Sequence, residues 1–370
     1  IKDIVPSGTI INIEADEVID AEAKIILPGL VECHTHTVFA GSRSSEFRDK
    51  LNGVSYEEIA LSGGGINKTV NAVRNTTIEE LIEITIPRID YFIAQGITTL
   101  EIKSGYGLDF ENEIKILRII HYLKQKYPID IISTFLGAHA FPAEFREDHK
   151  SYINLIVNDL LPYIAVNKLA EFCDGFCELT AFSPSEIETI FNKARELGIP
   201  VKLHTDQFNS IGGINVALKY NAVCIDHLEV ISDEDINKLG ESDAVCVLLP
   251  GVSFFLNHSY APARKLIEHN ALVALATDYN PGSSNICNLN FIMSLAALKM
   301  GMTIEETISA VTINAAKALG INDKCGSIEI GKKADLTLFN TDNYPDIVYN
   351  VGKNLNYMTI KNGEVIYIAD

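Results

Sequence analysis

The sequence predicts an α/β protein: a TIM-like (β/α)8 barrel with a small β-sandwich domain formed by the N- and C-terminal segments. Between residue 25 and about residue 320, short apolar runs ending in polar residues alternate with longer amphipathic segments, as strands alternate with helices. Eight such runs occur, which suits a closed barrel better than an open sheet. With 47% hydrophobic residues in a chain of 370, one large core and a smaller appendage can be buried.

The eight expected barrel strands lie in apolar segments spaced along the middle of the chain. In order they are "KIILPGLVECHTH" (24–36), "ITTLEIKSGYG" (97–107), "DIISTFLGAHA" (130–140), "CDGFCELT" (173–180), "PVKLHTD" (200–206), "AVCIDHLE" (222–229), "AVCVLLPG" (244–251) and "LVALATDYNPG" (272–282). Helix-like segments fill the intervals, among them residues 77–96, 110–127 and 183–198. The last of these opens with a Ser-Pro cap signal and ends at Gly198.

The two ends of the chain have a different pattern. Residues 8–24, 326–340 and 358–368 alternate apolar and polar side chains and carry Gly, Asp and Asn turn signals, as half-exposed β-strands do. We therefore expect residues 1–26 and 326–370 to form the small β-domain and residues 27–325 to form the barrel. The chain begins with Ile1 rather than Met, so the natural start is expected to lie further upstream.

Composition argues against several classes of partner. Forty-nine acidic and 30 basic residues give a net charge of −19, which would repel nucleic acid and anionic membranes. The longest strongly apolar stretch, near residues 244–256, contains Pro250 and Gly251 and falls short of the roughly 18 residues a membrane span needs. Seven scattered cysteines do not suggest a disulfide framework and favour a reducing cytoplasm. We expect a small-molecule substrate.

Ligand-type side chains stand where several of the expected strands end. They are His34, His36, His139, His204, His227 and Asp278. Catalytic groups of such barrels lie at the carboxyl ends of the strands. Because residues two apart in a strand face the same side, His34 and His36 should point together into the barrel mouth. Imidazoles with a carboxylate are a ligand set for zinc or non-haem iron, with a position left open for water.

Longer motifs carry a family resemblance over nearly the whole chain. "PGLVECHTH", "HTDQ", "DH" and "ATDYNPGS" resemble the amidohydrolase superfamily. "HTHTVFAGSR", "YEEIALSGGGI", "KSGYGL", "LGAHAFP" and "DYNPGSS" resemble, more narrowly, the imidazolonepropionase family of metal-dependent hydrolases. That family carries more sequence before Pro28, so we expect the small domain here to lack some strands.

The resemblance implies a set of site residues. The implied metal ligands are His34, His36, His204 and Asp278. The implied substrate contacts are Arg43, Tyr106, His139, Gln207, Asn280, Gly282 and Ser283, and the implied catalytic groups are Asp278, His227 and Gln207. It also implies one divalent or trivalent ion, zinc or iron, so Lys103 is set aside as a bridge between two metals. A homodimer is expected.

The implied reaction opens the cyclic amide of 4-imidazolone-5-propanoate to N-formimidoyl-L-glutamate, a step of histidine degradation, by metal-activated water. Asp278 would orient the water and carry its proton to the leaving ring nitrogen. His227 would stabilise negative charge on the carbonyl oxygen, and Arg43 would bind the propanoate through its planar fork. Which of the other contacts face the ring and which face the tail stays open.

Other interpretations remain. Arg43 as a surface cation and Tyr106 as a packed aromatic are the structural alternatives. A related deaminase of a nucleobase or similar ring is the first functional alternative, although such enzymes usually carry Glu where "HTDQ" has Gln207. A non-catalytic scaffold relative is the second, and it would be expected to have lost metal ligands that are present here.

Overall fold

The computed structural model describes residues 1–6, 9, 15, 17–54 and 64–369. Eight parallel strands lie next to one another in chain order, so the barrel prediction is confirmed. They are β2 (Leu30–Glu32), β3 (Ile97–Lys103), β4 (Asp130–Ala138), β5 (Phe172–Cys177), β6 (Leu203–Thr205), β7 (Cys224–His227), β8 (Val245–Leu248) and β9 (Leu272–Leu275). Just beyond the first and last strands, Thr35 pairs in parallel with Tyr279, which brings the two edges of the sheet together.

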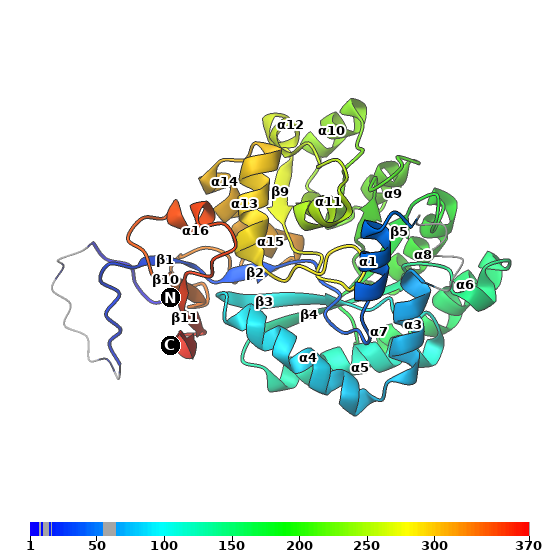
Figure 1. Ribbon diagram of the computed structural model, residues 1–370, viewed down its shortest axis with the longest axis horizontal. Helices are drawn as coiled ribbons and strands as arrows, with labels where there is room; N and C mark the ends of the chain where they lie inside the picture. Colours follow the sequence, from blue (N-terminus) through cyan, green and yellow to red (C-terminus); the bar gives the residue numbers. More distant parts are fainter. Residues whose placement is uncertain (7–8, 10–14, 16, 55–63, 370) are drawn as a thin grey trace.

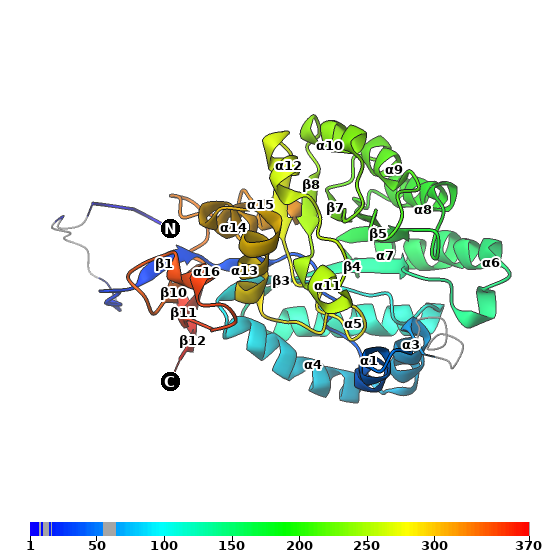
Figure 2. The ribbon, with the colours of Figure 1, turned by 45° about the horizontal axis from the view of Figure 1, so that its top comes forward.

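Helices surround these strands (Figure 2). In chain order they are α1 (Ser44–Leu51), α3 (Ile66–Asn75), α4 (Ile78–Ile93), α5 (Phe110–Lys126), α6 (His149–Asn154), α7 (Leu161–Asn167), α8 (Pro184–Glu196), α9 (Gly213–Lys219), α10 (Asp233–Gly240), α11 (Pro250–Leu256), α12 (Ala263–Glu268), α13 (Leu289–Met300), α14 (Ile304–Ala310), α15 (Ile313–Ala318) and α16 (Asp346–Tyr349), with a 3-10 turn η1 (Ala143–Phe145) and a π-helical turn η2 (Leu155–Leu160). The predicted cap of α8 is confirmed, because Ser183 and Glu186 form a reciprocal capping box.

The barrel strands are buried on both faces, and the face that points inward is polar. All seven residues of β3 are buried. Leu100 and Ile102 are fully buried members of the hydrophobic core. Glu101 and Lys103 alternate with them, and the Lys103 ammonium reaches Asp174 of β5, so this second set points to the barrel interior. The interior therefore holds charged groups that need partners.

A separate four-stranded antiparallel sheet lies beside the barrel (Figure 1). Its order is β1 (Ile25–Pro28), β10 (Leu336–Phe339), β11 (Asn356–Lys361) and β12 (Glu364–Ile368). The expected strand over residues 24–36 is therefore wrong as a single element, because its first half belongs to this sheet. Gly29 donates its N–H to Asp335 and Leu30 to Gly96, so the chain changes partner within one residue. A Cβ on Gly29 would lie 2.3 Å from the Thr98 hydroxyl oxygen.

Parts of the expected organisation stay predictions. Residues 7–8, 10–14 and 16 lie outside the described chain, and the described residues between 8 and 24 form no strand. Most of the motif "YEEIALSGGGI" (56–66) also lies outside the described residues. The division at residues 26 and 326 is not tested. Among the helices of the described ranges, none combines the length and the apolar character that crossing a membrane requires.

Candidate active site

The site forms where the two edges of the barrel meet. The segment after β2 and the segment after β9 are joined by two backbone bonds: Asp278 donates its N–H to the His34 carbonyl, and His36 donates to that of Tyr279. Deeper in the strands, the buried Glu32 carboxylate accepts the N–H groups of His34 and Thr277. These bonds bring His34, His36 and Asp278 to one place.

Four predicted ligands come together at this point. The Asp278 Oδ1 atom lies 3.3 Å from His34 Nε2 and 3.2 Å from His36 Nε2. The His204 ring, from β6, lies with its centroid 4.5 Å from that of His34. Within the described part of the chain, His34 Nε2, His204 Nε2 and Asp278 Oδ1 are buried without a hydrogen-bond partner. Buried polar atoms rarely stay unsatisfied, so atoms converging in this way fit a bound cation.

The other ring nitrogen of two of these histidines is already bonded. His34 Nδ1 lies 2.7 Å from Asp226 Oδ2, and His204 Nδ1 lies 3.1 Å from Asp174 Oδ1. An ionised carboxylate can only accept, so each Nδ1 carries a proton and Nε2 is the nitrogen left to bind a metal. This is the tautomer that a histidine ligand to metal needs.

Electrostatics favour neutral rings and an ionised carboxylate. Burial opposes charge on Asp278, but the adjoining His34 and His36 rings hold its pKa well below the ordinary value. Burial lowers the pKa of His36 and lowers that of His204 to about 4. Burial also lowers the pKa of the His139 ring, with the other histidines acting in the same direction. These rings offer lone pairs at neutral pH.

His34 differs from the other rings. Burial and the nearby Lys103 charge favour its neutral form, yet the Asp226 and Asp278 carboxylates outweigh them and raise its pKa to about 9. The cluster thus attracts positive charge strongly enough to hold an extra proton. Metal binding at such a site displaces that proton.

Backbone strain marks the same strand ends. Asp206, His227, Leu228 and Asp278 have φ values of 55°, 86°, 69° and 48°. Positive φ is uncommon for residues other than Gly and costs about 1–3 kcal/mol each where the backbone is strained. These four residues follow or end β6, β7 and β9. The tertiary structure therefore holds the reactive side chains in positions that the isolated chain would not favour.

Two predicted substrate contacts, His139 and Tyr106, stand beside the histidine cluster. The His139 ring stacks on that of His36 at 5.1 Å, and the Tyr106 ring lies 5.6 Å from His36 and 5.4 Å from His139. His139 is fixed by its Nδ1 atom, which lies 3.0 Å from the carbonyl oxygen of Gly105. Gln207, which follows β6, is 9% exposed.

The remaining predicted contacts form one cluster around the loop after β9. The Asn280 side chain accepts the N–H groups of Gly282 and Ser283 and donates to the Asp278 carbonyl. Arg43 lies against this loop, since a Cβ on Gly282 would be 2.1 Å from Arg43 Nη1. Arg43 also donates from Nε to Glu46 at 2.8 Å, and its terminal nitrogens have no hydrogen-bond partner in the described part of the chain, so they can bind another anion. The Asn280 hydrogen bonds thus stabilise the loop, and the terminal nitrogens of Arg43 can bind an anion.

His227 ends β7 with its ring centroid 5.4 Å from that of His204. Its Nδ1 atom lies 3.5 Å from Glu229 Oε1, too far for a good hydrogen bond. Among the described residues, both Glu229 oxygens and His227 Nδ1 are buried without a hydrogen-bond partner. A buried carboxylate with no partner is costly, which makes Glu229 a functional candidate that the sequence reasoning missed.

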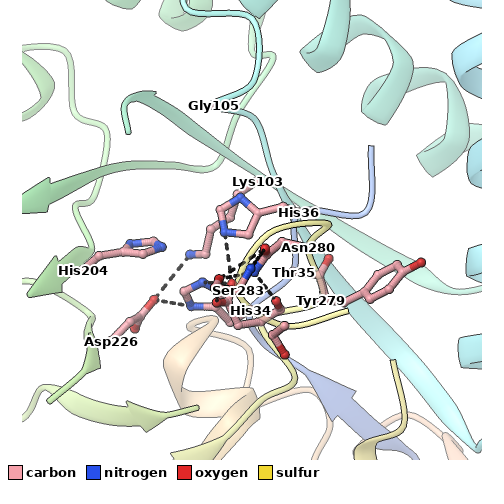
Figure 3. A network of polar contacts seen from close by, with 12 residues as sticks. His34, Thr35, His36, Lys103, Gly105, His204, Asp226, Tyr279, Asn280 and Ser283 are labelled. Carbon is pink, nitrogen blue, oxygen red and sulfur yellow. Dashed lines mark hydrogen bonds and ion pairs between the residues drawn. The ribbon is translucent and has the colours of Figure 1, made fainter. Parts of the chain in front are cut away.

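Sequence reasoning also missed the charges inside the barrel. They are Glu101, Lys103, Asp174, Lys202 and Asp226, and all are fully buried. Their signal was a charged residue within an apolar strand segment, as in "TLEIK" or "CIDH". Figure 3 shows Lys103 and His34 both in contact with Asp226, and the His204 ring beside them.

The sequence profile of the amidohydrolase family matches residues 25–366. An imidazolonepropionase from Geobacillus sp. (strain WCH70) is 45% identical over 350 residues, covering 95% of this chain and 82% of the relative. One from Alkaliphilus oremlandii is 47% identical over 350 residues, covering 94% of this chain and 83% of the relative.

Solved structures of lower sequence identity share the fold. A 5-methylcytosine deaminase from Klebsiella pneumoniae has a TM-score of 0.78 at 17% identity, covering all of this chain and 93% of its own. An adenosine deaminase from Xanthomonas campestris with bound zinc has a TM-score of 0.68 at 17% identity, covering 94% of this chain and 81% of its own. The profile match and the identity to curated relatives show that this chain belongs to the amidohydrolase family and, within it, to the imidazolonepropionases.

Proposed function

We propose that this protein hydrolyses the cyclic amide bond of 4-imidazolone-5-propanoate to N-formimidoyl-L-glutamate in histidine degradation. Its membership of the imidazolonepropionases supports the reaction. The observation that carries the chemistry is the convergence, beside His36, of His34 Nε2, His204 Nε2 and Asp278 Oδ1, which have no hydrogen-bond partner among the described residues. The substrate is a small molecule.

We take the bound ion to be zinc or iron, held by His34, His36, His204 and Asp278. The side chains of the three histidines each offer one ring nitrogen, all within 4.8 Å of one another. Nitrogen ligands with one carboxylate suit both metals. When bound, the ion lowers the pKa of a water molecule and so makes hydroxide available at neutral pH.

Asp278 and His227 have separate roles: proton transfer and stabilisation of negative charge. Hydrolysis joins the water oxygen to the carbonyl carbon, which becomes a carboxylate, and breaks the bond to the ring nitrogen, which gains a proton. Asp278 stays ionised and can accept the proton of the water and pass it to that nitrogen. His227, on the neighbouring strand end, can donate a hydrogen bond to the carbonyl oxygen as it gains charge.

The remaining residues hold the substrate. Arg43 can bind the propanoate with its two terminal nitrogens, because only Nε is engaged by Glu46. Tyr106 and His139 lie against His36 and can orient the ring. Glu229, buried beside His227, can accept an N–H of the ring, which would give its carboxylate the partner it lacks.

A deaminase of a nucleobase or similar ring is the alternative within the same family. Such enzymes usually carry Glu three residues after the histidine of β6, where its carboxyl group moves protons. This chain has Gln207 there, and an amide cannot release a proton at neutral pH. We therefore favour ring hydrolysis.

The test is an assay with elemental analysis. Purified protein should convert imidazolone propanoate to a product with the formimidoyl group, and should contain about one zinc or iron per chain. Removal of the ion with a chelator should abolish turnover, and its return should restore it. Full activity without detectable metal, or ammonia release from cytosine or adenine but no opening of imidazolone propanoate, would refute the proposal.

We also propose that the protein is a cytoplasmic homodimer, with the barrel over residues 27–325 and the small domain at the two ends. Sedimentation of the purified chain tests the dimer.

A further inference from the structure

One lysine inside the barrel has no role in the proposed reaction. Lys103 ends β3 and is fully buried. Its Nζ atom lies 2.8 Å from Asp174 Oδ2, 3.1 Å from Glu101 Oε2 and 3.5 Å from Asp226 Oδ2. The ammonium thus joins carboxylates from three different strands, and its contact with Asp226 is drawn in Figure 3.

Two of these carboxylates are the partners of histidine rings in the proposed metal site. Asp174 Oδ1 lies 3.1 Å from His204 Nδ1, and Asp226 Oδ2 lies 2.7 Å from His34 Nδ1. Lys103 uses the other oxygen of Asp174 and shares the same oxygen of Asp226. Each histidine is therefore linked to the ammonium through one carboxylate.

A cation is needed at this position. Asp174, His204 and Asp226 alone place three ligand atoms within 4.8 Å of one another, a spacing that can hold a metal ion. Without Lys103, the buried Asp174 and Asp226 carboxylates would face each other with little positive charge nearby. Like charges at such a distance repel strongly in a medium of low dielectric. The ammonium supplies the positive charge from within the chain.

The lysine is kept in its charged form. Burial alone would favour the neutral amine, but the three carboxylates raise the pKa of Lys103 well above its ordinary value. A lysine must be neutral to react with carbon dioxide, and the carbamate formed would be an anion facing Asp174, Glu101 and Asp226. Lys103 is therefore unsuited to bridge two metal ions as a carbamate.

We propose that Lys103 is a positioning residue: its ammonium holds the Asp174 and Asp226 carboxylates, which in turn orient the His204 and His34 rings as metal ligands. This inference rests on the metal site of the proposed function. Loss of a group that orients the ligands of a metal typically weakens metal binding by about 10–100-fold.

The test compares two buried lysines of the same network. Lys202 is also fully buried and lies 2.6 Å from Glu101 Oε1, but it forms no ion pair with Asp174 or Asp226 in the described chain. Lys103→Met and Lys202→Met each remove one buried ammonium and keep an unbranched apolar side chain that is one atom shorter. Zn²⁺ and Co²⁺ affinities are measured by competition with a chelator, and the visible spectrum of bound Co²⁺ reports ligand geometry.

Lys103→Met should bind both ions about 10–100-fold more weakly than the unchanged protein and should alter the Co²⁺ spectrum. Lys202→Met should match the unchanged protein in both measurements. Equal affinities for all three proteins, or equal weakening by the two substitutions, would overturn the inference. Failure of the unchanged protein to bind either ion would instead contradict the proposed function.

Asp226→Asn and Asp174→Asn cover the case in which Lys103→Met does not fold. Each keeps the side-chain shape but weakens the acceptor that faces a histidine Nδ1–H. Both should weaken metal binding and shift the Co²⁺ spectrum, and normal affinity and spectrum in both would exclude the arrangement.

Discussion

Several side chains at the barrel mouth depend on a neighbouring carboxylate, which engages one of their nitrogens and leaves another available. His34 and His204 present Nε2 because Asp226 and Asp174 engage Nδ1. Arg43 keeps its terminal nitrogens because Glu46 engages only Nε. The residue types were readable from the sequence, but the Asp226 and Asp174 partners of the two histidines come from other strands of the barrel.

Arg43→Lys tests whether the planar guanidinium group of Arg43 binds the propanoate of the substrate. Lysine keeps the positive charge but loses the planar pair of donors, so kcat/KM for imidazolone propanoate should fall by about 10–150-fold, equivalent to about 1.5–3 kcal/mol. Steady-state kinetics give the value. Arg48→Lys is the control, because Arg48 lies in α1, the helix that directly follows Arg43, is 73% exposed and pairs with Asp49. Unchanged kinetics for Arg43→Lys would mean that another residue holds the tail.

Asp278→Asn and His227→Ala separate metal binding from charge stabilisation. An amide can neither accept the water proton nor balance the metal charge, so Asp278→Asn should lose turnover and most of the metal. His227→Ala should keep its metal while kcat falls by roughly 10²–10³, the usual cost of one oxyanion donor. Elemental analysis beside kinetics distinguishes them. Loss of metal from His227→Ala would make His227 a ligand.

At the scale of elements, helices fix the loops that carry the site. Glu113 in α5 accepts the N–H groups of Gly105, Gly107 and Leu108, so its carboxylate shapes the loop that presents Tyr106. The eight strands were predictable because each is an apolar run of the right length. The break at Gly29 was not, because the residues before and after it are equally apolar and only their partners differ.

Glu113→Gln tests the loop after β3. The amide group would present N–H donors where a carboxylate accepts three, so the free energy of unfolding should fall by about 1–3 kcal/mol. Displacement of Tyr106 should raise KM while the metal content stays unchanged. Denaturant unfolding and kinetics provide the measurements, and Glu111→Gln, an exposed neighbour in the same helix, is the control. A normal KM with lower stability would show that Tyr106 does not depend on this anchor.

On the scale of the whole molecule, the small sheet binds the end of the barrel opposite the site. Asp130 is the first residue of β4, and its Oδ2 atom lies 2.7 Å from Lys361 Nζ and 2.8 Å from Lys333 Nζ. Thr359 donates to the Ile93 carbonyl at the end of α4. Because the active-site groups follow the other ends of the strands, this junction should affect stability rather than catalysis.

Asp130→Asn tests the junction through its pH dependence. Burial opposes the charge on Asp130, but the two lysines lower its pKa below the ordinary value. The folded protein therefore gains stability from the ionised form above about pH 4 and loses it as the pH falls through the lower, folded-state pKa. Urea unfolding should show the variant less stable at pH 7, with a difference that shrinks below about pH 4. The exposed Asp159→Asn should show no such trend, and reduced kcat in Asp130→Asn would contradict the separation of stability from catalysis.

The barrel, the candidate ligands and the family resemblance could be predicted from the sequence, because strand periodicity and strand-end histidines are local patterns. Which groups meet depends on the tertiary structure. The pairing of Lys103 with Asp174 and Asp226, the unpartnered Glu229 and the strained φ values at His227 and Asp278 depend on closure of the barrel. Closure brings residues from distant strands within hydrogen-bonding distance in a buried interior, where each charge must find a partner, and no local pattern encodes that distance.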